Sequence, residues 1–181
     1  MTSRRSPAVD RRHRLAGARR KVVLTVHVVA AVALLGASTV LLVTGLHAAT
    51  RDDPQEAHAI YSLLRLLTFS LDVPLAFIGL ASGVLLAVTS KWGIFRYWWV
   101  TTKLAILLTT IVLGATLIGP SISTMLDVTE TSNPSESSVR WRLIAVASVQ
   151  VTLLLVAATL GVFKPGGHVQ WPRLARRAAL D

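Results

Sequence analysis

Residues 22–46 read VVLTVHVVAAVALLGASTVLLVTGL and contain no formally charged side chain. A helix of these 25 residues, rising ~1.5 Å per residue, is long enough to cross a hydrocarbon core of ~30 Å. Surface helices of soluble proteins keep one polar face, whereas this stretch is apolar all round. The stretch therefore predicts a transmembrane helix and makes the chain an integral membrane protein.

Three further apolar runs follow at about residues 61–89, 99–119 and 141–163. The chain has 181 residues, which is enough for one compact helical bundle without a second folded domain. Only 15% of the residues are charged and 52% are hydrophobic, in keeping with four membrane spans. We expect an all-α membrane protein whose four transmembrane helices form an up-down bundle within residues 21–164.

The positions of the basic residues predict the orientation of this bundle. Of the nineteen Lys and Arg residues, eight precede the first span, two lie between the second and third, and four follow the last. The other two loops carry little more than Arg51 and Arg140. By the positive-inside rule both termini are cytoplasmic. The excess of Arg over Lys, fifteen to four, and the many alanines indicate a GC-rich bacterial genome, hence a bacterial plasma (inner) membrane.

Two basic segments flank the spans, an arm at residues 1–20 and a tail at residues 165–181. The arm has too few apolar residues to fold alone, so we expect it to be disordered or to lie on lipid headgroups. A net charge of +10 in a soluble protein would favour nucleic acid as the partner. Beside transmembrane helices, however, basic tails contact anionic lipids, which predicts a lipid partner and no nucleic acid.

Small residues in the second span form a stripe at Gly79, Gly83 and Ala87. Helices in lipid associate through close backbone approach, so such stripes belong at helix contacts. We expect this stripe to pack against another helix of the same chain. A homo-oligomer that uses small-residue faces is the alternative.

Apart from Arg142 at the boundary of the fourth span, four ionisable side chains lie within the expected spans: His27, Arg65, Asp72 and Lys103. Each costs roughly 3 kcal/mol to insert, so each needs a physical reason to be there. Arg65 and Lys103 lie near the beginnings of their helices, where long side chains can extend back to the membrane surface. Their positions therefore have a structural explanation that requires no function.

Asp72 is too short and too deep to reach the headgroups. It precedes Pro74, which lacks an N–H and disrupts the helical hydrogen bonds there. One hypothesis makes Asp72 an ion or proton site. The other makes it a protonated side chain that is hydrogen-bonded to a polar neighbour at similar depth, with Gln150, Ser38 and Thr39 as candidates, or joined to Arg65 through water.

His27 lies at the same expected depth as Lys103, and we expect the two side chains to face each other across the first and third helices. No other histidine lies in a span, so a bis-histidine haem site within one chain is excluded. His47 and His58 in the first loop are weak candidate metal ligands, because their spacing matches no metal motif. Cysteine is absent and no catalytic constellation is present, so we expect no cofactor and no enzyme activity.

Three short segments, residues 25–32, 79–87 and 98–104, resemble a bacterial family of small predicted four-helix integral membrane proteins of unknown function. More remotely, the pattern is similar to the copper-resistance D type of membrane proteins, in which a histidine in one helix accompanies a lysine early in another. By this resemblance His27 and Lys103 correspond to recurrent polar positions. A soft Cu(I) site would have few ligands, since the methionines are only Met1 and Met125.

Three hypotheses for function follow from the sequence. The first is a multi-pass membrane protein with a non-enzymatic role. The second is a small transporter or ion- and proton-handling protein that uses His27, Asp72 and Lys103. The third is a metal- or haem-associated membrane subunit.

Overall fold

A computed structural model of the chain describes residues 7–51, 53–89, 98–131 and 137–163, and these residues are almost entirely helical. The first segment is the single helix α1 (Pro7–Ala49) and the fourth is α6 (Ser137–Phe163). The second consists of α2 (Pro54–Leu67), the π-helical turn η1 (Thr68–Asp72) and α3 (Val73–Thr89). The third consists of α4 (Trp98–Leu113), the π-helical turn η2 (Gly114–Ile118) and α5 (Gly119–Thr131).

All four segments are long and apolar enough to cross a membrane. The candidate spans are Gly17–Ala49, Pro54–Thr89, Trp98–Thr129 and Ser138–Phe163, of 33, 36, 32 and 26 residues. Their outer faces carry large apolar side chains such as Val32 and Val43, which a soluble bundle would turn inward. An all-helical fold with four membrane-length helices is thus confirmed for the described residues.

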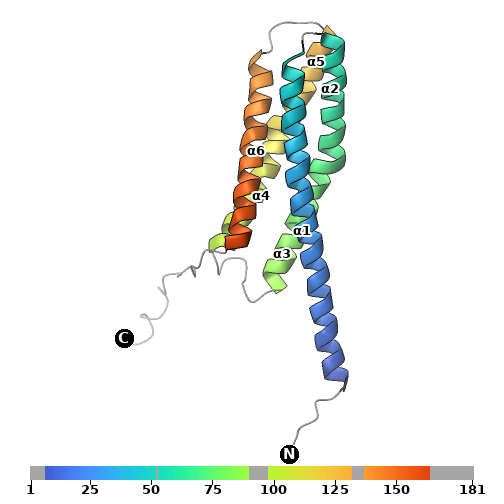
Figure 1. Cartoon of the computed structure of the whole chain (residues 1–181), viewed down its shortest axis with the longest axis vertical. Coiled ribbons are helices and arrows are strands. Elements are labelled where there is room, and N and C mark those ends of the chain that lie inside the picture. Colours follow the sequence, from blue (N-terminus) through green and yellow to red (C-terminus); the bar gives the residue numbers. More distant parts are fainter. Residues whose placement is uncertain (1–6, 52, 90–97, 132–136, 164–181) are drawn as a thin grey trace, which may run out of the picture.

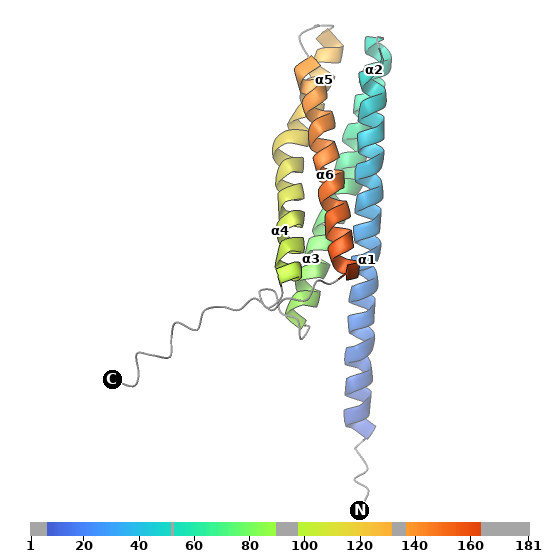
Figure 2. The same cartoon turned by 60° about the vertical axis from the view of Figure 1, so that its left-hand side comes forward.

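The four segments pack in a closed ring in which each contacts two neighbours. α1 packs against the second segment and against α6, while the third segment packs against the second and against α6. Figures 1 and 2 show α2 and α5 at one end of the bundle and α3 and α4 toward the other. We call these the α2/α5 end and the α3/α4 end.

Two apolar clusters fill the interior of the bundle. The larger cluster lies at the α2/α5 end and includes Leu41, Tyr61, Met125 and Leu143. The smaller one consists of Leu34, Ala76 and Leu154. Polar side chains, described below, separate the two clusters.

Each π-helical turn lies just before a proline. The N–H of Val73 bonds to the carbonyl of Thr68, five residues back, and Pro74 follows. Likewise the N–H of Gly119 bonds to the carbonyl of Gly114, and Pro120 follows. A proline ring collides with the carbonyl four residues earlier in a regular α-helix, and the wider turn relieves that collision.

The third helix differs from the sequence prediction. We expected it to end at Gly119-Pro120 and to be followed by a loop over residues 121–140, but α5 continues it to Thr131. Inside a bilayer an interrupted backbone has no water to bond to, so a helix that accommodates the proline through η2 is favoured over one that stops. Residues 132–136 lie outside the described residues.

The other helix boundaries also differ from expectation. α2 begins at Pro54 rather than near residue 61, because the Asp53 side chain accepts a hydrogen bond from the Gln55 N–H and proline suits the first helical position. α6 begins at residue 137 rather than at 141.

The expected disordered arm is corrected for residues 7–20, because α1 begins at Pro7. Arginine is a good helix former, and extending a helix already nucleated by the span costs little. Residues 1–6, the basic turn at 90–97 and the tail at 164–181 lie outside the described residues, so the predictions for them are untested.

Candidate functional site

Three polar side chains meet in the middle of the bundle: Ser38 of α1, Asp72 of η1 and Gln150 of α6. They are 2%, 9% and 3% exposed. Asp72 lies midway along the span Pro54–Thr89, and Gln150 lies midway along Ser138–Phe163. We call these three residues the central polar cluster.

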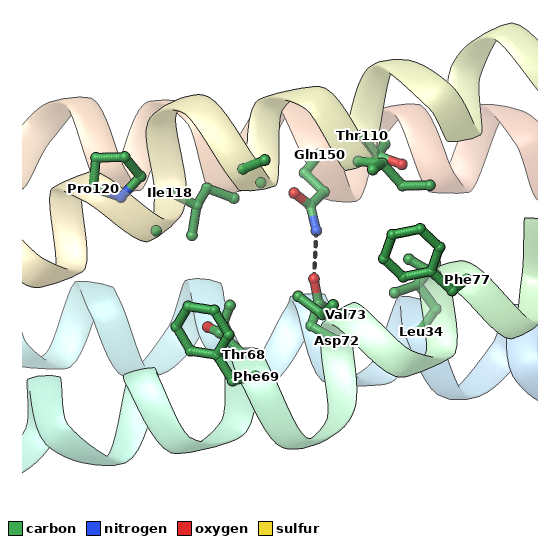
Figure 3. A pocket seen from close by; sticks show the side chains of 15 residues that line it. Leu34, Thr68, Phe69, Asp72, Val73, Phe77, Thr110, Ile118, Pro120 and Gln150 are labelled. Atoms are coloured by element: carbon green, nitrogen blue, oxygen red, sulfur yellow. Dashed lines mark hydrogen bonds between the residues drawn. The ribbon is translucent and has the colours of Figure 1, made fainter.

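Hydrogen bonds connect all three members of this cluster. Ser38 Oγ donates to Asp72 Oδ1 at 2.8 Å, and Gln150 Nε2 donates to Asp72 Oδ2 at 3.0 Å. The same amide nitrogen donates to Ser38 Oγ at 3.0 Å. Figure 3 shows the bond between Gln150 and Asp72. Of the partners that the sequence offered for Asp72, Ser38 and Gln150 are bonded to it.

Two other expected neighbours lie elsewhere. Thr39 is exposed and donates to the carbonyl of Leu35, one turn earlier in its own helix. Arg65 is also exposed, whereas Asp72 is buried. The carboxyl group therefore meets a hydroxyl and an amide rather than the guanidinium of Arg65.

Ser38 and Gln150 use all of their side-chain hydrogen-bond donors within the central polar cluster. A glutamine amide has two N–H groups, and both are used on Ser38 and Asp72; the single hydroxyl proton of Ser38 is also used. The amide oxygen of Gln150 is buried and has no hydrogen-bond partner among the described residues. Such a buried acceptor costs about 1–3 kcal/mol, so its persistence points to a ligand that donates to it.

A cavity of about 390 Å³ lies beside the cluster, and its walls include Asp72 and Gln150. Residues of both π-helical turns line it, among them Thr68 and Phe69 from η1 and Ile118 from η2 (Figure 3). Most of the lining is apolar. Its volume and its few polar groups are typical of a small-molecule site.

The two threonines in the cavity wall supply no free donor either. Thr68 Oγ1 donates to the carbonyl of Leu64, and Thr110 Oγ1 donates to the carbonyl of Leu107. The polar groups that line the cavity therefore offer acceptors: two hydroxyl oxygens, a carboxyl group and the unpartnered amide oxygen of Gln150. A wall of acceptors suits a cation or a hydrogen-bond donor.

A second polar group lies toward the α3/α4 end, where His27 of α1 packs against α3. Its Nδ1 lies 3.2 Å from the carbonyl oxygen of Gly79 and 3.1 Å from Ser82 Oγ. The carbonyl can only accept, and the Ser82 hydroxyl already donates to Ile78 at 2.6 Å. Nδ1 must therefore carry the proton, which leaves Nε2 of the neutral ring as an acceptor.

Lys103 of α4 packs against a different helix from His27. Its ammonium group lies beside Gly161 of α6, where an added Cβ would stand 2.8 Å from Nζ. We call His27 and Lys103 the inner polar pair, and the expectation that the two side chains face each other stays a prediction.

The small-residue stripe packs inside the chain. A Cβ at Gly83 would lie 3.0 Å from Cε1 of His27, and one at Gly79 would lie 3.9 Å from Leu107. Ala87 is buried on the same helix. Gly83 thus makes room for the histidine, a role that the small-residue pattern alone did not predict.

Gly83→Ala should lower the stability of the purified protein, because the methyl group pushes the imidazole away from Gly79 and Ser82. Overpacking of this kind costs about 1–3 kcal/mol. Gly36→Ala is the matched control, since a Cβ there meets nothing within 4 Å. Thermal unfolding in detergent compares the two, and equal midpoints would show that the histidine does not need the space.

The histidines at the α2/α5 end bond to separate partners. His47 Nε2 accepts a hydrogen bond from Arg51 Nη2 at 2.9 Å, and His58 Nδ1 lies 3.0 Å from Thr129 Oγ1. Across residues 7–51, 53–89, 98–131 and 137–163, no three His, Cys, Asp or Glu side chains group in a way that could hold a metal ion. The weak metal prediction for this loop therefore gains no support.

Sequence reasoning missed several features of these sites. Ser82 and Gly161 are an ordinary serine and glycine in apolar runs, and the turn η2 has no signature beyond Pro120. Pro120 was the available signal, because Pro74 had already indicated an irregular turn beside Asp72.

Comparison with known proteins finds no match, whether with family models, curated proteins or solved structures. The resemblance to small four-helix membrane proteins and to the copper-resistance D type stays a prediction.

Proposed function

We propose that the chain is a non-enzymatic, multi-pass protein of the bacterial plasma membrane that binds a monovalent cation at the central polar cluster in exchange for a proton of Asp72. The observation that carries this proposal is the unpartnered amide oxygen of Gln150, buried beside a carboxyl group. Both groups line the same cavity.

The position of the Asp72 carboxyl group in the middle of the membrane supports the exchange of a cation for a proton. An ionised carboxylate at this depth is costly unless a positive charge accompanies it. A bound cation meets that need, and the amide oxygen of Gln150 adds a second ligand. When the cation leaves, a proton takes its place on Asp72, so the site stays neutral and one proton is exchanged for each cation.

The inner polar pair offers a place where protons can pass to and from the α3/α4 end. Nε2 of His27 is an acceptor with no hydrogen bond among the described residues. Ser38 lies three helical turns further along α1, ~16 Å away at ~1.5 Å per residue.

Proton release tests the proposal. Purified protein in lipid nanodiscs in a weakly buffered solution should release about one proton per bound cation when a cation is added from a panel of Na⁺, K⁺ and a quaternary ammonium ion. Empty nanodiscs provide the baseline. If none of the three cations releases protons above that baseline, the exchange proposal is wrong.

We also propose that the four helices form an up-down bundle with both termini and the α3/α4 end in the cytoplasm. The distribution of Lys and Arg supports this orientation, and it brings the basic tails to anionic lipids. Reporter fusions after Ala49 and Ser132 should read as outside, and those after Trp92 and Gly167 as cytoplasmic. A cytoplasmic reading at Ala49 would reverse the orientation.

A further inference from the structure

The cavity beside Asp72 is much larger than an inorganic ion requires. Its volume of about 390 Å³ accommodates a small organic molecule, and its walls are mostly apolar. A bare Na⁺ or K⁺ would leave most of this space empty or filled with water in contact with apolar groups. Size and lining together indicate an organic ligand.

The cavity opens on the outer surface of the bundle. Phe69 and Phe77 line it, yet they are 58% and 55% exposed, and Val73 between them is 37% exposed. These three residues belong to the middle of the span Pro54–Thr89, where the surroundings are acyl chains. A ligand that reaches the cavity from this side must first dissolve in the hydrocarbon core.

The polar part of the ligand must be a donor or a cation. The polar groups in the cavity wall are acceptors, and Asp72 provides a negative charge once its proton leaves. The rings of Phe69 and Phe77 lie on either side of Asp72 in the cavity wall (Figure 3), and aromatic faces attract organic cations. An anionic ligand would face the carboxyl group without a compensating positive charge.

We propose that the cavity takes up a lipophilic organic cation, an apolar body with an ammonium group, directly from the bilayer through the opening beside Phe69 and Phe77. This inference rests on the proposed function, because it names the class of cation that displaces the proton of Asp72. The apolar body occupies the space between η1 and η2, and the ammonium group lies beside Asp72 and Gln150.

Three probes with one naphthyl body separate the possible ligand classes: naphthylmethyl-trimethylammonium, naphthylethanol and naphthylacetate. Binding to the protein in nanodiscs is followed by naphthyl fluorescence, with empty nanodiscs subtracted for partition into lipid. The ammonium probe should bind at least ~10-fold more tightly than the alcohol, because the pair of charges contributes more than ~1.4 kcal/mol. The carboxylate should show no saturable binding.

Gly114→Leu is designed to fill the cavity. Gly114 lines it, and a Cβ added there meets nothing within 4 Å, so the first atom of a larger side chain is accommodated. The variant should fold and should weaken binding of the ammonium probe ~10-fold or more, by loss of the space that the apolar body uses. Gly36→Leu, on the exposed face of α1, is the matched control and should bind as the wild type does.

The results of the probe and variant experiments distinguish this inference from the proposed function. Equal binding of the ammonium and alcohol probes would overturn the inference and identify the cavity as a site for neutral amphiphiles or acyl chains. Full binding by Gly114→Leu would place the ligand elsewhere. A different result is that Na⁺ or K⁺ releases protons, while the ammonium probe neither binds nor releases them. In that case this inference fails and the proposed function stands. If no cation releases protons, both fail.

Discussion

Asp72→Asn is expected to abolish proton release on cation binding while the protein keeps its fold. The asparagine carbonyl can still accept the hydrogen bond that Ser38 Oγ now gives to Oδ1 at 2.8 Å. The variant has neither a charge to pair with a cation nor a proton to exchange. A desolvated charge pair contributes at least about 2 kcal/mol, so cation affinity should also fall ~30-fold or more.

Asp53→Asn is the matched control for this variant. Asp53 is exposed at the beginning of α2, where asparagine caps a helix as well as aspartate does. It should bind and release protons as the wild type does. Unchanged proton release from Asp72→Asn would remove Asp72 from the site, and an unfolded variant would show that the bundle requires its carboxyl group.

Gln150→Leu is expected to lower the free energy of unfolding by about 1–3 kcal/mol. Leucine is close in size to glutamine, but it leaves Asp72 Oδ2 and Ser38 Oγ without the donor that they share. A single interhelical hydrogen bond in a membrane contributes modestly on average. Because this variant loses two such bonds, we expect its loss of stability to lie toward the upper part of that range. Unfolding in detergent measures the change.

A double-mutant cycle isolates the interaction. Gln150→Leu should cost clearly less in a background that already carries Asp72→Leu, because the principal acceptor is gone. Thr152→Val controls for the loss of a polar group on α6, since Thr152 is exposed and donates to the carbonyl of Ser148 in its own helix. Equal costs for Gln150→Leu in both backgrounds would mean that the cluster is not coupled.

The apolar runs were sufficient to predict four helices of membrane length, because the length of a span follows from the rise of a helix, but they did not predict where the second, third and fourth helices begin or end. The same reasoning predicted that Ser38, Asp72 and Gln150 lie at one level. It could not separate Ser38 from Thr39, since neighbouring residues differ by about 100° around the axis and a helix that is apolar all round does not reveal which face is buried. The structure places Ser38 inward and Thr39 outward.

The irregular turns could not be predicted in the same way. Gly119-Pro120 is a normal helix-ending pair, and the packing of α5 against α2 and α6 favours a helix that continues past it. The cavity depends on two π-helical turns at the same depth in different helices. Their alignment is a property of the packed bundle rather than of either segment, so the sequence indicated a polar group at Asp72 but no space beside it.

The depths of His27 and Lys103 in their helices predict only part of the surroundings of these side chains. Equal depth predicts that His27 and Lys103 face each other, which stays a prediction, whereas the structure shows His27 against Gly83 and Lys103 against Gly161. The protonated ring nitrogen became clear only from Ser82 and the carbonyl of Gly79, which depth alone does not identify. Backbone carbonyls of a neighbouring helix can accept hydrogen bonds wherever a glycine allows the two helices to approach closely.

The exchange of a proton for a cation at Asp72 is tested most directly by infrared difference spectroscopy of the protein in lipid nanodiscs. Adding the cation that binds should remove the carbonyl stretch of one protonated carboxyl group and produce a carboxylate band. Asp72→Asn should show neither change. Saturable cation binding that leaves the protonated-carboxyl band intact, or a band change that persists in Asp72→Asn, would contradict the exchange.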